Sequence, residues 1–356
     1  SKRFKISPDE TLQVAQDLYE RKLTTYPRTD ARVLSSAVAK EISKNIRGLR
    51  SFDPVAPFAQ NIMEHGLYKN IGKSSYTDDS KITDHYAIVP TGQVNEYKSL
   101  TELQKRVYEL IVRRFLSIFY PPAQYQTVKL TIGIEKESFF AGAKVLKVPG
   151  YLEIAGRPDT KEKREKEDGD GEENNPKNSA ALLKLADSLK EGDAAEVKEF
   201  LVKEGKTSPP KRYTSGSMVL AMENAGQLIE DEDLREQIKG SGIGTSATRA
   251  EIVKKLVSNK YIALNKKTQI VTPTLTGEMI VNVVSASIGS LLNPTLTASW
   301  EKGLTYVAEG SVTEEEYMQK LDKFVTQKTN IVKQNNFQYQ LRQSFDQIAP
   351  YYQKKK

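Results

Sequence analysis

The stretch Leu23-Thr24-Thr25-Tyr26-Pro27-Arg28-Thr29-Asp30 carries more information about the fold than any other part of the sequence. It follows a run with apolar residues at helical spacing, and its proline predicts a tight turn directly behind that helix. The phenolic oxygen of Tyr26 can form a covalent link to phosphate, and the guanidinium of Arg28 can donate two hydrogen bonds to phosphate oxygens. A Tyr-x-Arg pair alone is weak evidence, because an ordinary tyrosine is usually a half-buried packing residue.

The composition describes a soluble globular protein with a basic surface. The 356 residues predict two or three domains, and 38% of them are hydrophobic while 28% are charged. A net charge of +7 favours a polyanionic partner, although a protein that is merely basic would show the same charge. The absence of cysteine excludes disulfides, cysteine-ligated zinc and thiol catalysis, and it fits a cytoplasmic protein.

The sequence was also searched for membrane spans and for a signal segment at the N-terminus. No apolar run approaches the length needed to span a membrane, and no apolar signal segment follows the first residues. The sequence also begins without a methionine, so we expect it to be part of a longer protein.

The first of three predicted domains, residues 1–120, is helical. Ser7-Pro8-Asp9-Glu10 predicts a helix start, with serine as the N-cap, proline in the first position and acids in the first turn. Further helical patterns cover residues 35–47 and 100–119, and Pro121-Pro122 ends the last of them.

The second predicted domain, residues 121–210, is rich in β-structure. Alternating apolar residues predict a hairpin of two strands at residues 125–134 and 138–148, and a further strand at 194–202. Between them, residues 159–179 are almost wholly charged or Gly, Asn and Pro, which predicts a flexible surface insertion.

The third predicted domain, residues 211–356, is mostly helical. Pro209-Pro210 precedes it, and a small hairpin is expected at residues 261–271. Two helices followed by this hairpin resemble a winged-helix element, which is a common nucleic-acid-binding arrangement.

A histidine lies in a second stretch of interest, Ile82-Thr83-Asp84-His85-Tyr86-Ala87-Ile88-Val89-Pro90-Thr91. A lone histidine in an apolar, strand-like segment is usually a packed residue. A protonated imidazole can, however, donate a hydrogen bond to a phosphate.

Two later stretches also suit phosphate binding. Residues 209–217, Pro-Pro-Lys-Arg-Tyr-Thr-Ser-Gly-Ser, offer the charge of Arg212 and a helix N-cap at Thr214. Residues 240–249, Gly-Ser-Gly-Ile-Gly-Thr-Ser-Ala-Thr-Arg, place glycines before a helix start. The free N–H groups and positive dipole end of such a start suit a phosphate.

These four stretches, in this order, resemble the motifs of type IA DNA topoisomerases, in particular the topoisomerase III branch. Two positions depart from the family pattern: Tyr86 stands where members often have a second His or a Glu, and Ser215 where they usually have Glu. The resemblance implies a multidomain α+β fold that forms part of the family's toroid. Its parts would be a helical, CAP-like or winged-helix-like tyrosine domain, an antiparallel β arch and a mostly helical DNA-binding domain.

The resemblance implies roles for the matching residues. Tyr26 would be the nucleophile that cuts one DNA strand and holds its 5′ phosphate, and Arg28 would steady the developing charge. His85 would face the scissile phosphate. Gln16 and Glu20, four apart on one helix face, would support the site. The implied DNA contacts are Thr25, Arg212, Gly242, Gly244, Thr245, Thr248 and Arg249.

The family's cleavage site also uses an N-terminal acidic domain that binds magnesium through clustered carboxylates. No part of this sequence matches that domain, so the resemblance implies magnesium ligands outside the chain and none within it. We therefore expect the chain alone to bind single-stranded DNA weakly and not to relax supercoiled DNA. The resemblance further implies an ATP-independent, monomeric bacterial enzyme in the cytoplasm, associated with the nucleoid and not with a membrane.

Three functions stay open on the sequence. The whole protein could be an enzyme that passes DNA strands through a transient break at Tyr26, and so relaxes negative supercoils or decatenates DNA. The chain could instead be a non-catalytic single-stranded-DNA-binding module in which Tyr26 is only structural. It could also be a protein-interaction fragment whose charge is incidental. A binding module would not need Tyr26 and Arg28 together with His85, and this combination favours the enzyme.

Overall fold

The computed structural model describes residues 3–156, 176–194, 196–202, 204–230, 232, 235 and 242–352. The chain divides into two compact units. Unit 2 comprises residues 14–208, and unit 1 comprises residues 1–13 together with residues 209–356. The first helix, α1 (Pro8–Glu20), begins in unit 1 and ends in unit 2.

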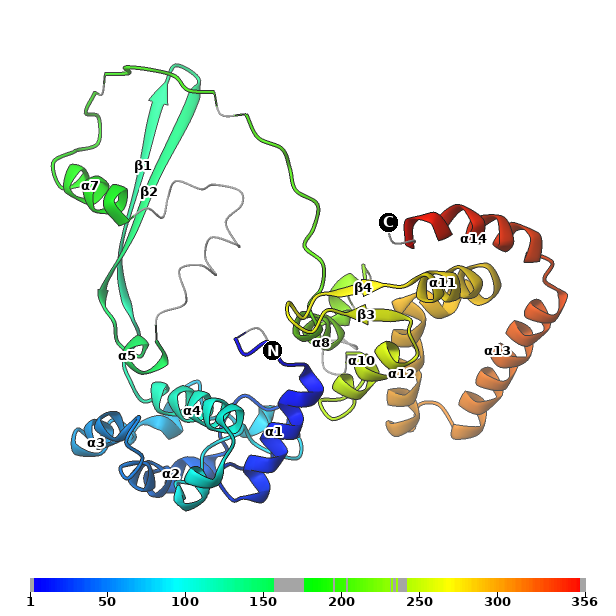
Figure 1. Cartoon of the computed structure of the whole chain (residues 1–356), viewed down its shortest axis with the longest axis horizontal. Coiled ribbons are helices and arrows are strands. Elements are labelled where there is room, and N and C mark those ends of the chain that lie inside the picture. The colour runs from blue at the N-terminus through cyan, green and yellow to red at the C-terminus, as the bar shows by residue number, and fades with distance from the viewer. Residues whose placement is uncertain are drawn as a thin grey trace. The chain divides into compact units, whose positions relative to one another are not determined.

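The helical part of unit 2 surrounds one apolar core (Figure 1). Its elements are the end of α1, α2 (Ser36–Leu49), α3 (Ala56–Glu64) and α4 (Glu102–Ser117), with the 3₁₀ turns η1 (Ile71–Lys73), η2 (Asp79–Lys81) and η3 (Asn95–Ser99). The largest of its almost fully buried side chains are Leu18, Leu23, Ile42, Ile46, Leu49, Ile62, Tyr108, Val112 and Leu116. All four helices contribute to this set, so each is stabilised by burying one apolar face against the others.

Local sequence sets the helix starts. Ser7 and Glu10 form a reciprocal pair at the start of α1, in which each backbone N–H donates to the other residue's side-chain oxygen. The predicted N-cap is therefore confirmed. Thr101 and Gln104 form the same capping box at the start of α4, and Ser35 caps α2.

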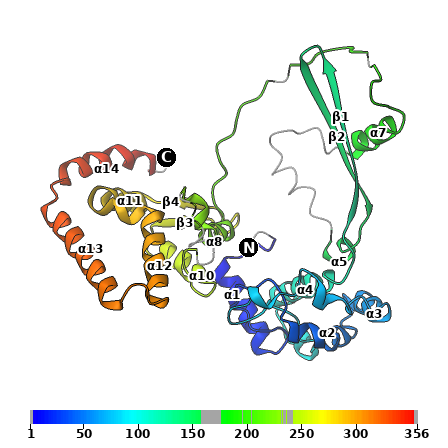
Figure 2. The same cartoon turned by 180° about the vertical axis from the view of Figure 1, so that it is seen from behind.

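A two-stranded antiparallel ribbon follows α4. Its strands are β1 (Gln124–Ile134) and β2 (Glu137–Val148), which confirm the predicted hairpin. The short helix α5 (Leu152–Ala155) comes next, and α7 (Pro176–Ala186) lies beside the ribbon (Figures 1 and 2).

One expectation for this region is wrong, and another lies largely outside the described residues. Residues 194–202 do not form the predicted strand in the part of them that the structure describes. The ring of Phe200 contacts that of Phe139 on β2, with centroids 5.9 Å apart, but the backbone does not join the ribbon. Alternating apolar residues do not by themselves supply the partner backbone that a strand needs. The predicted flexible insertion, residues 159–179, lies largely outside the described residues, and its end instead begins α7 at Pro176, since proline fits the first helical turn.

The first part of unit 1 contains two helices and a hairpin. Thr214 caps α8 (Ser215–Glu223), as predicted, and η4 (Ala225–Leu228) follows. The helix α10 (Arg249–Ser258) leads into β3 (Ile262–Leu264), which pairs antiparallel with β4 (Val271–Pro273). This order of elements is the one expected of a winged-helix element.

The rest of unit 1 is helical, with α11 (Leu275–Ile288), η5 (Gly289–Leu292), α12 (Pro294–Ala308), α13 (Glu314–Gln334) and α14 (Gln338–Tyr352). Both α13 and α14 contact α11. The half-buried Trp300 of α12 packs edge-on against Tyr317 and Phe324 of α13, with ring centroids 5.5 and 5.7 Å apart. These contacts give Trp300 a packing role between α12 and α13.

One apolar stretch among the described residues is longer than we expected. Residues Leu275–Ala308 are long and apolar enough, by length and composition alone, to cross a membrane, so the expectation that no run approaches this length is wrong. The stretch is nevertheless divided into α11, η5 and α12. The longest of these has 15 residues and measures about 22 Å, whereas the hydrocarbon core of a bilayer is about 30 Å thick.

Candidate functional site

The end of α1 sets the direction in which the chain approaches Tyr26. The N–H of Leu23 donates to the carbonyl of Leu18, and that of Lys22 donates to the carbonyl of Tyr19, which is the Schellman pattern of helix termination. Lys22 has a φ of 59°, in the left-handed region that glycine usually occupies at this position. Leu18 and Leu23 are both fully buried, so the helix end is anchored in the core.

Residues 22–29 then run antiparallel to residues 85–91, and we call these two stretches the paired segments. Thr25 connects them at the centre. Its N–H donates to the carbonyl of Val89, and its Oγ1 accepts from the N–H of Val89, each at 2.9 Å. One threonine thus satisfies both backbone groups of its partner, which fixes the register of the pairing.

Threonines also close both ends of the paired segments. The Oγ1 of Thr91 donates to the carbonyl of Lys22 at 2.6 Å, and the Oγ1 of Thr29 donates to the carbonyl of His85 at 2.6 Å. The tyrosine and histidine segments are therefore held to each other on both sides of Tyr26.

Helix α2 supports the histidine segment from behind. The Nδ2 of Asn45 donates to the carbonyl of Pro90 at 2.8 Å. A Cβ atom on Gly48 would lie 2.3 Å from the carbonyl oxygen of Gly92, so only glycine allows this approach of the two backbones.

Two aspartates order the loop that precedes the histidine segment, and one of them, Asp79, ties it to the start of α2. Asp79 accepts a 2.9 Å hydrogen bond from the N–H of Ser36, and hydrogen bonds from the side chain and then the backbone of Ser36 lower the pKa of Asp79. Asp78 accepts bonds from Lys81 and Ser80, which lower the pKa of Asp78 to about 2.

The ring of Tyr26 lies between two other rings. Its centroid is 4.7 Å from that of His85, with the planes tilted by 53°, and 5.2 Å from that of Tyr19, which it meets edge-on. Tyr26 is half-buried, whereas Arg28 and His85 are exposed. The Tyr26 hydroxyl and the Arg28 guanidinium make no hydrogen bond or ion pair with any residue that the structure describes, so both groups are open to a ligand.

Gln16 and Glu20 lie on one face of α1, as their spacing predicts. The Nε2 of Gln16 donates to Oε1 of Glu20 at 2.9 Å, which orients the carboxylate close to the helix end. The residue before Glu20 is Tyr19, whose ring touches Tyr26, so the helix and the tyrosine run are in direct contact.

The predicted catalytic residues all lie in unit 2, on the end of α1 and the paired segments. They are Gln16, Glu20, Tyr26, Arg28 and His85. His85 lies in an extended loop and not in the strand-like segment we expected. The sequence motifs indicated no role for Thr29 or Tyr19. A threonine hydroxyl beside a turn is a signal for a bond such as that of Thr29, but no sequence pattern indicates the ring contact of Tyr19.

The glycine stretch lies in unit 1, and its first two residues, 240 and 241, are outside the described residues. Gly242 has a φ of 59°, and a Cβ on it would lie 2.6 Å from the carbonyl oxygen of Glu223. Gly244 also has a positive φ, of 68°. Both positions therefore require glycine, which lets this turn lie directly against the end of α8.

The rest of this stretch forms the start of α10. The Oγ1 of Thr248 accepts from the N–H of Thr245 at 2.8 Å, and no side chain caps α10. Arg249 is buried, and its Nε donates to the carbonyl of Ile243 at 3.2 Å. Its position thus braces the glycine turn, whereas the sequence suggested an exposed charge.

The remaining predicted DNA contact, Arg212, is exposed in the segment before α8. The nearby Ser215, which departs from the family pattern, is fully buried, and its Oγ donates to Oε1 of Gln269 at 2.7 Å. A glutamate would have to bury its charge there, so the serine is suited to this packing.

The described residues do not form a magnesium site. Among the described parts of the chain, no three His, Asp or Glu side chains gather as they would around a metal ion. Magnesium prefers carboxylate ligands and water, and neither Glu20 nor the aspartates before the histidine segment form such a set.

The fold and the site define the class of protein. The model of a family described as DNA topoisomerase matches residues 1–319, and the chain therefore belongs to the DNA topoisomerase family. Its motifs and relatives are those of the type IA enzymes, in the topoisomerase III branch.

Two relatives illustrate the similarity. The chain is 32% identical over 342 residues to DNA topoisomerase 3 of Bacillus licheniformis, and 31% identical over 339 residues to that of Bacillus subtilis. Each alignment covers 94% of this chain but only 43% and 44% of the two relatives. The chain thus spans less than half the length of the curated relatives it matches.

A solved structure shares the fold. Full-length topoisomerase I from Thermotoga maritima superposes with a TM-score of 0.53 at 21% identity. The match covers 91% of this chain and 47% of that protein, and it supports the mixed arrangement of helices and small antiparallel sheets.

Proposed function

We propose that this chain supplies the strand-cleaving tyrosine of a type IA topoisomerase, and that this tyrosine is Tyr26. One observation carries the proposal. The Tyr26 ring is held against Tyr19 and His85, while its hydroxyl has no partner among the described residues. The ring is thus held in place while the hydroxyl stays available to a phosphate, which is what a tyrosine nucleophile requires.

The reaction is a transesterification. The phenolic oxygen of Tyr26 forms a bond to the phosphorus of a DNA phosphodiester, and the bond from phosphorus to the 3′ oxygen breaks. The phenol loses a proton, and the 3′ oxygen gains one and leaves as a hydroxyl. The energy of the broken ester is kept in the 5′-phosphotyrosine, so the reverse reaction rejoins the strand without ATP.

The neighbouring groups suit the charge that develops on the phosphate. Arg28 is exposed two residues after Tyr26 and can donate two parallel hydrogen bonds to non-bridging oxygens. His85 meets the same ring and can donate one when protonated. Glu20, which is oriented by Gln16 at the end of α1, would support the site.

We propose that unit 1 binds single-stranded DNA through the glycine turn and the start of α10. The helix has ten residues and no side-chain cap. The N–H of Arg249 donates to the carbonyl of Thr245, which leaves the N–H groups of Ala250 and Glu251 to donate to a phosphate. Thr25 in unit 2 and Thr245, Thr248 and Arg212 in unit 1 would add further contacts to the backbone of the strand.

The whole protein would pass DNA strands through the transient break and so relax negative supercoils or decatenate DNA. It would act in the cytoplasm as a monomer. The magnesium that the whole protein would need would take its ligands from outside the described residues.

The test is covalent capture of DNA by the full-length protein that contains this chain. With a single-stranded oligonucleotide, a label at the 3′ end should stay with the protein, whereas a label at the 5′ end should be released. Tyr26→Phe should abolish the adduct, and Tyr76→Phe, which removes a hydroxyl elsewhere in unit 2, should keep it. An adduct formed by Tyr26→Phe would exclude Tyr26 as the nucleophile.

A further inference from the structure

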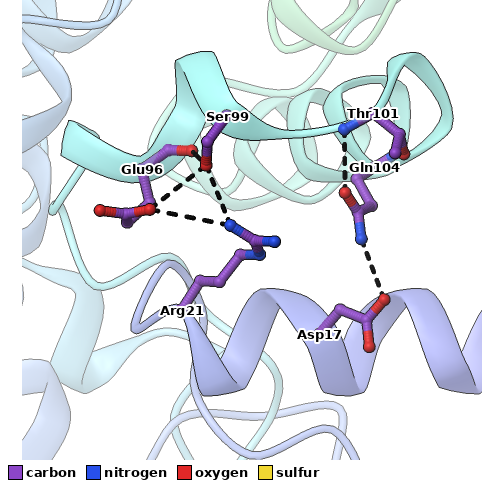
Figure 3. A network of polar contacts seen from close by, with 6 residues as sticks. All are labelled: Asp17, Arg21, Glu96, Ser99, Thr101 and Gln104. Carbon is purple, nitrogen blue, oxygen red and sulfur yellow. Dashed lines mark hydrogen bonds and ion pairs between the residues drawn. The ribbon is translucent and has the colours of Figure 1, made fainter.

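A polar network joins α1 to the start of α4 (Figure 3). Nε2 of Gln104 donates to Oδ2 of Asp17 at 2.9 Å. Gln104 is buried, so this bond is shielded from water.

The orientation of the Gln104 amide is fixed by its second bond. Its Oε1 accepts from the N–H of Thr101 at 2.9 Å, as part of the capping box that starts α4. Because the oxygen must face Thr101, the nitrogen must face Asp17. One side chain thus both caps its own helix and holds the neighbouring one.

A second contact lies four residues after Asp17, at Arg21, which directly follows α1 and whose N–H donates to the carbonyl of Asp17. An Arg21 guanidinium nitrogen donates to Oγ of Ser99 at 2.9 Å and lies 3.7 Å from a carboxylate oxygen of Glu96 (Figure 3). Asp17 and Arg21 are four residues apart, so both contacts lie along one face of the helix. Two points on one face fix the rotation of a helix about its axis.

We propose that Asp17 and Gln104 are positioning residues for the cleavage site, and this inference rests on the function proposed above. Gln16 and Glu20 are the residues directly before Asp17 and Arg21, so the rotation that the network fixes decides where they point. The same rotation sets the edge-on contact of Tyr19 with Tyr26. A small error in such placement costs much in rate while leaving substrate binding intact.

The variant Gln104→Glu separates this bond from the helix cap. Glutamate can still accept from Thr101, so α4 keeps its capping box. It cannot donate to Asp17 and instead places a second carboxylate there. We expect Gln104→Glu in the full-length protein to lower the maximal rate of adduct formation about ten- to hundredfold, with DNA affinity unchanged.

The decisive readout is rescue by a second change. In Asp17→Asn with Gln104→Glu, the asparagine amide on α1 can donate to the glutamate on α4, which restores the bond with its polarity reversed. We expect the double variant to recover most of the rate. Ser35→Ala, which removes the N-cap of α2, serves as a control that lowers stability without touching the network.

The outcomes are distinct. A normal rate for Gln104→Glu, or no recovery in the double variant despite normal thermal unfolding, would overturn the positioning role. An adduct formed by Tyr26→Phe would instead overturn the proposed function. A rate loss in Ser35→Ala equal to that in Gln104→Glu would show that stability, and not position, governs cleavage.

Discussion

The ring of His85 lies 4.7 Å from the ring of Tyr26, centroid to centroid, although 59 positions separate the two residues in the sequence. The contact exists because Thr25 and Thr29 bond to the backbone of the histidine segment. The imidazole is thereby placed against the ring whose hydroxyl would receive the phosphate.

Replacing His85 tests this placement. His85→Gln in the full-length protein should slow adduct formation about ten- to a hundredfold, because a neutral amide replaces the charged hydrogen-bond donor that a protonated imidazole offers to the developing charge. Single-turnover cleavage of a labelled oligonucleotide measures the rate. His65→Gln, at the end of α3, is the matched control and should cleave normally; equal losses in both variants would contradict a role specific to His85.

Removing the hydroxyl of Thr25 should separate the paired segments. In Thr25→Val the N–H of Val89 loses its acceptor in a partly buried place, which we expect to cost about 1–3 kcal/mol in the free energy of unfolding. Denaturant unfolding of the chain measures this loss. Thr25→Ser keeps the hydroxyl and should retain most of the stability, and a valine variant as stable as the serine variant would argue against the bond.

Gly242→Ala should weaken DNA binding by unit 1. The added Cβ meets backbone carbonyls of α8 and the positive φ adds strain, so the turn must move. We expect a several-fold rise in the dissociation constant for a labelled single-stranded oligonucleotide, measured across a salt series, with binding that weakens as salt rises. Gly289→Ala, where a Cβ meets nothing within 4 Å, is the control. If binding did not depend on salt, the result would favour the alternative of a protein-interaction fragment whose positive charge is incidental.

The low pKa of Asp78 predicts a pH-dependent contribution to stability. The bonds from Lys81 and Ser80 favour the charged form, so the folded-state pKa of about 2 lies below the value of 3.8 expected when unfolded. The contribution is therefore complete above about pH 4 and is lost as the pH falls towards 2. Thermal unfolding of wild type and Asp78→Asn should differ at pH 6 and converge near pH 2. A difference that is constant with pH would contradict this account.

The chain by itself should bind single-stranded DNA weakly and should not relax supercoiled DNA. Phosphoryl transfer depends on charge neutralisation, and the described residues offer no metal cluster for it. Agarose-gel relaxation of a negatively supercoiled plasmid, with and without magnesium, measures this. Magnesium-dependent relaxation by the chain alone would contradict this expectation, because it would show that the chain itself holds the magnesium.

Patterns within a few residues were predictable from the sequence, and contacts between distant segments were not. The caps at Ser7 and Thr214 follow from side chains that bond to backbone three residues away, and the hairpin of β1 and β2 follows from alternation. The absent strand at residues 194–202 shows the limit, because a strand also needs a partner that alternation does not specify.

The same limit applies to the site. The motif spacing indicated Tyr26, Arg28 and His85 as candidates, but the bonds of Thr29 and Thr91 across the paired segments depend on the fold. The burial of Arg249 could not be predicted either. An arginine after a glycine turn has the same sequence pattern whether it braces the turn or faces solvent.

The paired segments also limit how the length of this loop can change. Surface loops usually accept added residues. Here Thr25 and Thr29 bond to fixed points on either side of Tyr26, so one residue inserted between them would have to break a bond or turn the tyrosine away from His85. Among natural variants of this protein, insertions should therefore be absent between Thr25 and Thr29, although the segment contains no helix or strand.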